Sequence, residues 1–361
     1  MRRTIRILPL ACGAVVLAAS PGYCSDLGRL VTARRADAAG TPVVRPVMSL
    51  PASVTAPRPT SRLQEPPPQF VFKFGSAGSL PGQFATPAGM DTDAQGNLYV
   101  CDRDNRRIQK FDPSGRFLMQ IAPGGVLGEP LTLAHDLALD DEGNLYVAEP
   151  FDNRIRVFSP AGQLLRVFGR LYGFDSPFAL DFQNGQLFVL DVQHGKVRIF
   201  DRYGQPSGGG TQPEYFDIQY PGESFGMAVS SMSDIYITSQ SHCAVTKYDW
   251  AGRKQMEWGA PGTGPGEFSH MTDIAVDPSG NVYVTDRTLG RVQKFDANGG
   301  FLSMWGSNGE GDGQFSALNC ITTDHLGRIY VNQLLNPRIQ VFAYVVAVQP
   351  TTWSQMKAKY R

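Results

Sequence analysis

Residues 96–115 read GNLYVCDRDNRRIQKFDPSG, and the same pattern returns along the chain. Residues 143–162 read GNLYVAEPFDNRIRVFSPAG, and residues 280–299 read GNVYVTDRTLGRVQKFDANG. Aligned on the aromatic residue of the YV-type pair, six units follow at steps of 47, 42, 48, 47 and 47 residues: Tyr99, Tyr146, Phe188, Tyr236, Tyr283 and Tyr330. This period is typical of propeller blades, each of which buries its faces against the next copy.

Each unit reads as four short strands separated by turns. A short apolar run comes first, and a Gly-Asn turn follows, which is favoured in tight hairpins that need a positive φ. The second strand is aromatic and β-branched, as in LYV, and the third alternates, as in RIQKF. A turn such as DPSG leads to the fourth strand. The 39 glycines and 26 prolines fit this succession of short strands and turns.

The two ends of the repeat array complement each other. The sixth unit lacks a fourth strand after residues 338–346, RIQVFAYVV. Residues 70–84, FVFKFGSAGSLPGQF, have no preceding strands but match residues 301–315, FLSMWGSNGEGDGQF. The first strand should therefore complete the last blade and close the ring without an exposed edge. The sequence predicts an all-β, six-bladed β-propeller over residues 70–346.

The pattern D-x-x-N-x-R-[IV]-x-x-F, together with a glycine-rich connector that ends in GQF or GEF, resembles the NHL repeat. The resemblance covers about residues 70–346 and is strongest in the first, second and fifth units. It implies a six-bladed propeller with a central channel. It also implies that the chain is either a binding module or one of a few lyases, because both use this fold.

The segments outside the repeats predict export. Residues 1–24 combine a basic start, a short apolar run and small and turn residues, which is the pattern of a secretory signal peptide. Residues 25–69 are rich in proline and poor in apolar residues, so we expect a disordered linker. Residues 347–361 form a polar tail. The expected location is the periplasm, the cell envelope or the medium, and membrane association would require lipidation of Cys24.

Composition limits the partners and cofactors. The chain carries 33 basic and 33 acidic residues, which argues against a general nucleic-acid binder. The cysteines are scattered and lack CxxC spacing, so no zinc knuckle or dense disulfide framework is indicated. Buried free thiols are the expectation for Cys101 and Cys320, with a disulfide between these two as the alternative.

Three columns of side chains should meet on one face, where connectors enter the first strands and the second strands end. The first column is Ala88, His135, Ser176, Phe225, Thr272 and Asn319. The second is Asp102, Glu149, Asp191, Ser239, Asp286 and Gln333, and the third is Arg107, Arg154, Lys196, Ala244, Arg291 and Arg338. Because nearly every unit has the acid–base pair, we expect it to bridge each hairpin structurally.

The candidate binding residues lie at the mouth of the channel or beside it. They are His135, Phe225, Tyr220, Arg103 and Arg287, with the turn acids Asp102, Glu149, Asp191 and Asp286. His135 and Phe225 depart from the repeat, and sites are expected where local consistency breaks. Tyr220 belongs to the irregular insert 201–225, which reads either as an aromatic recognition loop or as an excursion without a partner.

These features favour an exported, non-catalytic module that binds a protein, peptide or glycan on its rim, without a cofactor. The alternative is a metal-dependent lyase or hydrolase with its site near His135, similar to the amidating lyases or the streptogramin lyases. Zinc on channel histidines or calcium on the ring of acids would belong to that alternative, but His135 is the single histidine in its column. A third hypothesis is a structural scaffold of the cell envelope without a small ligand.

Overall fold

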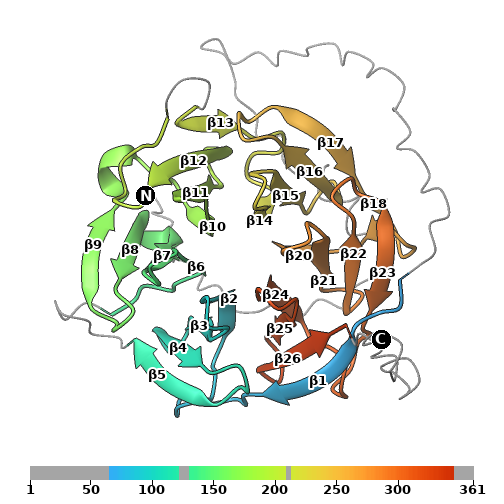
Figure 1. Cartoon of the computed structure of the whole chain (residues 1–361). Coiled ribbons are helices and arrows are strands. Elements are labelled where there is room, and N and C mark those ends of the chain that lie inside the picture. The colour runs from blue at the N-terminus through green and yellow to red at the C-terminus, as the bar shows by residue number, and fades with distance from the viewer. Residues whose placement is uncertain (1–64, 122–129, 209–212, 345–361) are drawn as a thin grey trace, which may run out of the picture.

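The structure, a computed structural model, describes residues 65–121, 130–208 and 213–344. These residues form six four-stranded antiparallel sheets arranged around a central axis, as the sequence predicts (Figure 1). Regular helix in the described residues is confined to two three-residue 3-10 turns, η2 (Pro150–Asp152) and η3 (Arg170–Tyr172). None of the described helices has the length and apolar character needed to cross a membrane.

Each of the first five blades runs from the axis outward in chain order. Blade 1 is β2 (Pro87–Thr92), β3 (Leu98–Asp102), β4 (Arg107–Phe111) and β5 (Phe117–Ile121). Blade 2 is β6 (Asp136–Leu139), β7 (Leu145–Glu149), β8 (Arg154–Phe158) and β9 (Leu164–Phe168). Blade 3 is β10 (Pro177–Gln183), β11 (Gln186–Asp191), β12 (Lys196–Asp201) and β13 (Tyr215–Asp217).

The remaining blades follow the same plan, with one exchange at the end. Blade 4 is β14 (Ser224–Val229), β15 (Ile235–Ser239), β16 (Ala244–Tyr248) and β17 (Lys254–Trp258). Blade 5 is β20 (Met271–Val276), β21 (Val282–Asp286), β22 (Arg291–Phe295) and β23 (Phe301–Trp305). Blade 6 is β24 (Leu318–Thr323), β25 (Ile329–Gln333), β26 (Arg338–Ala343) and β1 (Gln69–Phe74). A short parallel pair, β18 (Ala260–Pro261) and β19 (Glu267–Phe268), shapes the connector between blades 4 and 5.

The ring closes as predicted. β1 is antiparallel to β26, with Gln69 opposite Ala343 and Phe74 opposite Ile339. In Figure 1 the blue β1 lies along the red β26 as the outermost strand of blade 6. The backbone N–H of Glu65 donates to the Leu302 carbonyl of blade 5 at 3.0 Å, so the chain is already held to the propeller before β1 begins.

The repeated motif has a structural explanation in the connectors. Arg107 Nη2 donates to the carbonyls of Leu80 and Gln83, and Gln109 Nε2 also donates to the Gln83 carbonyl, at 2.7 Å. Gly82 has φ +80° and donates its N–H to Gln109 Oε1, which explains the glycine. The connectors before blades 5 and 6 make the same bonds through Gln293 and Gln340. In blades 1, 5 and 6 the motif therefore fixes the connector on its own blade.

Candidate functional site

The acidic residues that end the second strands are buried inside the blades and bond to the connectors, and we call them struts. Asp102, Glu149, Asp191 and Asp286 have fully buried side chains. Each carboxylate accepts a backbone N–H from the connector of its own blade: the donors are Ala85, Thr132, Asp175 and Ser269. These four predicted binding residues are therefore enclosed and already bonded, which places them beneath the rim rather than on it.

The basic partners of the struts vary between blades. Arg107 Nε donates to Asp102 Oδ2 at 2.9 Å, and Arg154 Nε donates to Glu149 Oε2 at 2.7 Å. In blade 3 the partner of Asp191 is Arg198 at 2.8 Å, because the predicted partner, Lys196, instead pairs with Asp217. The acid–base bridge expected from the sequence is thus present, with one substitution of the base.

Three rings gather at the mouth of the channel. The ring centroids of His135 and Phe178 are 3.5 Å apart, and Phe225 packs edge-on against Phe178 at 5.3 Å. The sequence placed Ser176 in this column, and that placement is wrong: Phe178 occupies it. Four residues separate the paired Phe182 and Leu187 in the inner hairpin of blade 3, against five in the corresponding hairpin of blade 2, and this shorter turn accounts for one residue of the two-residue error.

A small recess lies below the rings. Its volume is about 30 Å³, and its lining includes His135, Phe178 and Phe225 on one side and Thr272, Asp273 and Asn319 on the other. Burial, with the charge of Arg103, lowers the pKa of His135 to about 3, so the imidazole is neutral at physiological pH. The recess has room for a group the size of a water molecule, not for a whole substrate.

Four carboxyls line the channel below the recess. Each accepts a backbone N–H from the inner strand of the next blade: Asp91 from Leu139 at 2.8 Å, Asp136 from Leu180 at 2.8 Å, Asp181 from Val229 at 2.7 Å and Asp273 from Ile321 at 2.9 Å. The surrounding sheets remove these groups from bulk water. Desolvation raises the pKa of Asp91 and Asp273 to about 6 and of Asp181 to about 7. It raises the pKa of Asp136 well above its usual range, with Asp273 adding to the effect.

The channel carboxyls predict that stability depends on pH. Asp181 keeps its proton up to about pH 7 in the folded protein, whereas a carboxyl in the unfolded chain loses it near pH 4. The folded state binds the extra proton between these values, so the stabilisation is complete below about pH 4. It is lost as pH rises toward 7, by up to about 1.4 kcal/mol per pH unit. Asp181→Asn cannot ionise and should be more stable than the natural chain at pH 8.

Urea midpoints at pH 5, 6, 7 and 8 check this prediction. The natural chain should lose stability relative to Asp181→Asn as pH rises, while Asp141→Asn, which removes an exposed carboxyl, should follow the natural chain. His135 and His270 have lowered pKa values that act in the opposite direction below about pH 6.5. They are present in all three chains and cancel from the comparison. Parallel profiles for the natural chain and Asp181→Asn would refute the prediction.

Tyr220 lies away from the three rings. Its ring stacks on His242 at 3.8 Å, and its hydroxyl lies 3.3 Å from both carboxylate oxygens of Glu257. Within the insert 201–225, Phe216 is buried against Tyr248 and belongs to the core between blades 3 and 4. Phe216 therefore has a packing role. Only the exposed tyrosines of the insert remain available to a recognition loop.

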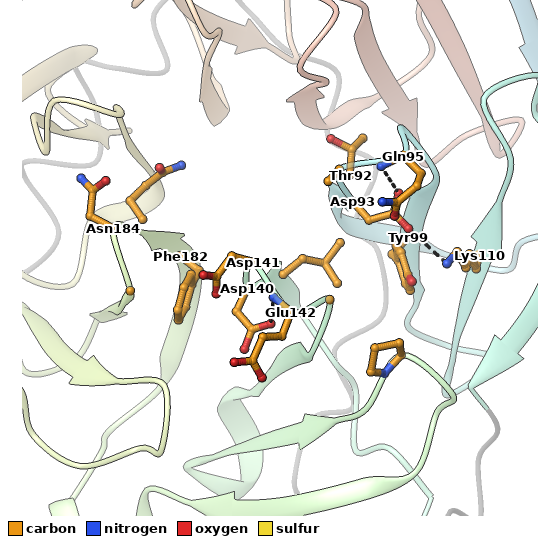
Figure 2. Close-up of a pocket in the computed structure, with 16 residues that line it drawn as sticks. Thr92, Asp93, Gln95, Tyr99, Lys110, Asp140, Asp141, Glu142, Phe182 and Asn184 are labelled. Atoms are coloured by element: carbon orange, nitrogen blue, oxygen red, sulfur yellow. Dashed lines mark hydrogen bonds and ion pairs between the residues drawn. The ribbon is translucent and has the colours of Figure 1, made fainter.

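A second cavity lies on the opposite face, between the turns of blades 1, 2 and 3 (Figure 2). Its volume is about 620 Å³, which is large enough for a small molecule. Its polar groups serve the fold, however: Asp93 accepts from the turn backbone and pairs with Lys110, and Asp140 accepts the N–H of Asn144. Asp141 and Glu142 pair with Arg202 of blade 3.

The cysteines fall into two groups. Cys101 and Cys320 are free and buried, so the expectation of buried thiols is confirmed for them and the alternative disulfide between them is wrong. Cys243 is disulfide-bonded. The described parts of the chain bring together no three His, Cys, Asp or Glu side chains in an arrangement that could hold a metal ion.

Comparison with known proteins agrees with this architecture. The pattern described as NHL repeat matches residues 84–111, and the one described as 6-bladed beta-propeller matches residues 229–304. The chain is a six-bladed β-propeller that carries an NHL repeat. The predicted signal peptide, most of the linker and the C-terminal tail of this NHL propeller lie outside the described residues.

The NHL propeller is similar over short segments to larger animal proteins. It is 38% identical over 73 residues to Protein brain tumor of Drosophila melanogaster, which is 20% of this chain and 7% of that protein. It is 37% identical over 98 residues to the human E3 ubiquitin-protein ligase TRIM32, which is 27% of this chain and 14% of the ligase. The matching segments thus span a small fraction of these relatives.

Solved structures share the fold across most of the NHL propeller. A streptogramin B lyase aligns with TM-score 0.54 at 11% identity, covering 75% of this chain and 97% of the lyase. A gluconolactonase from Xanthomonas campestris aligns with TM-score 0.53 at 16% identity, covering 72% and 87%. A protein of unknown function from Bacteroides thetaiotaomicron aligns with TM-score 0.58 at 17% identity, covering 75% and 74%. At these identities the likeness concerns the fold alone.

Proposed function

We propose that this NHL propeller is an exported, non-catalytic binding module that holds a protein, peptide or glycan over its channel mouth. The observation that carries the proposal is the recess of about 30 Å³ beneath His135, Phe178 and Phe225. An enzyme pocket usually encloses most of its substrate, whereas this recess accepts only a small projecting group. A partner would therefore rest on the rim and insert one group.

Export is part of the same proposal and is supported by residues 1–24, which have the composition of a signal peptide. The similarity to an E3 ubiquitin-protein ligase, a protein that acts on other proteins, is consistent with a protein partner. A lyase or hydrolase at His135 would have the carboxyls of Asp136 and Asp273 in the same recess, but a volume of about 30 Å³ leaves no room beside them for a substrate.

Partner capture by the whole exported chain tests the proposal. Phe225→Ser removes an aromatic edge from the mouth, and Met232→Ser makes a similar change at an exposed turn on the opposite face. We expect the natural chain and Met232→Ser to retain the same partner from an envelope extract, and Phe225→Ser to lose at least about tenfold, which corresponds to the 1.4 kcal/mol of one good apolar contact. Equal capture by all three chains would refute a site at the mouth.

A further inference from the structure

Arg287 begins the turn after β21 at the channel mouth, and its charge has no acidic partner among the described residues. Its Nε donates to the Leu318 carbonyl and its Nη2 to Asn319 Oδ1, both at 2.8 Å. A guanidinium carries five N–H donors, so these two bonds to neutral oxygens leave donors open. Cations removed from water are normally paired with an anion. This one lacks an anion from the described part of the chain.

Three blades hold the Arg287 guanidinium in place. Its backbone N–H donates to the His270 carbonyl of blade 5 at 2.8 Å, and its side chain is bonded to blade 6. Asn319, which accepts from Arg287, donates in turn to the Pro87 carbonyl of blade 1 at 3.1 Å. Because the group is already ordered, a bound anion would lose little further side-chain entropy by contacting it.

A second cation lies near the same point. Burial lowers the pKa of Arg287, and the charge of Arg103 lowers it further. Arg103 directly follows β3 of blade 1 as Arg287 directly follows β21 of blade 5, so both lie on the same face of the propeller, and the charges of both lower the pKa of His135. Arg103 pairs with Asp104 at 3.0 Å, but both side chains are substantially exposed, and such a pair contributes little. An anion between the two arginines would relieve their mutual repulsion.

The walls of the recess limit what can carry that anion. The faces of His135 and Phe178 cover each other, with Phe225 edge-on to Phe178. This packing covers one face of His135 and one face of Phe178, and the rings beside the arginines supply apolar surface for a side chain. Asn319, the acceptor of the Arg287 bond, lines the recess, but the carboxyls of Asp136 and Asp273 line it as well, so the anion would lie above the recess, against the guanidinium groups.

We propose that the channel mouth binds the carboxyl terminus of a peptide or protein whose last side chain is apolar, with Arg287 and Arg103 on the carboxylate. A planar carboxylate matches the donor fork of a guanidinium, and capture of a terminal carboxylate is a recurring mode of peptide recognition. The last side chain would lie against the edges of Phe178 and Phe225. This inference rests on the proposed binding function and narrows it to one chemical group.

Paired peptide probes test this inference on the whole chain. Fluorescein-labelled Gly-Ser-Gly-Phe with a free carboxyl terminus is compared with its terminal amide by fluorescence anisotropy. We expect the acid to bind at least tenfold more tightly than the amide. Arg287→Gln should reduce binding of the acid to the level of the amide, and Arg103→Gln should weaken it several-fold. Arg106→Gln, which removes the same charge from an exposed position in the turn of Arg103, should stay within twofold of the natural chain.

The outcomes separate this inference from the proposed function. Equal binding of acid and amide, no binding of the acid at millimolar concentration, or unchanged binding by Arg287→Gln would each overturn it. Tighter, Arg287-dependent binding of tri-galacturonate or inorganic phosphate would also overturn it and point to an acidic glycan or a phosphate group. Thermal midpoints of both arginine variants confirm that they fold. If a partner is captured through Phe225 whether or not its carboxyl terminus is free, the proposed binding function is retained and the carboxylate inference is refuted.

Discussion

Glu149→Ala is expected to destabilise the propeller by about 3–5 kcal/mol, because it removes the buried carboxylate that pairs with both Arg154 and Arg156. The Glu149 carboxylate has no exposed surface. It lies 2.7 Å from Arg154 Nε and 2.7 Å from Arg156 Nε, and it accepts the backbone N–H of Thr132. Removal would therefore break two ion pairs and release the connector of blade 2. The loss in free energy of unfolding is obtained from the shift in urea midpoint, multiplied by the m-value of the natural chain.

The matched control is Asp152→Ala in the same turn. Asp152 also pairs with Arg154, at 2.9 Å, but its side chain is partly exposed and Arg154 retains Glu149. We expect this change to cost less than about 1 kcal/mol, as for other exposed pairs. Similar losses in the two variants would mean that the turn acids are ordinary surface charges and not struts.

Removal of β1 should abolish the folded monomer. A chain that starts at Gly75 loses every backbone pair between β1 and β26, together with the packing of Phe70, Phe72 and Phe74. Three partly buried phenylalanines contribute several kcal/mol in total, at about 1.5–3 kcal/mol for each fully buried ring. The unpaired edge of β26 would also favour aggregation. Size-exclusion chromatography should show aggregate or no soluble protein.

A chain that starts at Glu65 is the control, because it keeps β1 and the bond of Glu65 to Leu302. Under reducing conditions, which open the disulfide of Cys243 in the natural chain, it should elute as the natural chain does, with the same thermal midpoint. A synthetic peptide of residues 65–76 added in trans should restore soluble protein to the chain that starts at Gly75. A stable, soluble monomer without β1 and without the peptide would show that this strand does not close the ring.

The fold could be predicted from the sequence because the same pattern of strands and turns occurs in six successive units. The YV-type aromatics gave the blade period, and the match between residues 70–84 and 301–315 predicted the closure that β1 and β26 form. Blade 3 was misaligned by two residues at Ser176, and its inner hairpin, which is one residue shorter, accounts for one of them. A shorter turn leaves the pairing between the two inner strands intact, so the repeat pattern alone does not reveal it.

The site was less accessible to sequence reasoning. His135, Phe225 and the rim arginines stood out as departures from the repeat, but the stacking of Phe178 on His135 depended on the register of blade 3. The channel carboxyls were missed, although Asp91 and Asp181 sit within otherwise apolar inner strands and could have signalled a channel-facing position. Within the described residues Arg287 bonds to neutral oxygens where blades 5, 6 and 1 meet, and no linear pattern contains that meeting.

Hydrogen exchange of the whole chain, with and without its captured partner, tests the site at the channel mouth most directly. We expect slowed exchange in the turns 103–106 and 287–290 and at the start of β14, around Phe225. The turns 139–143 and 182–185, which border the large cavity on the opposite face, should exchange as in the free chain. Protection confined to those opposite-face turns would contradict a binding site at the mouth.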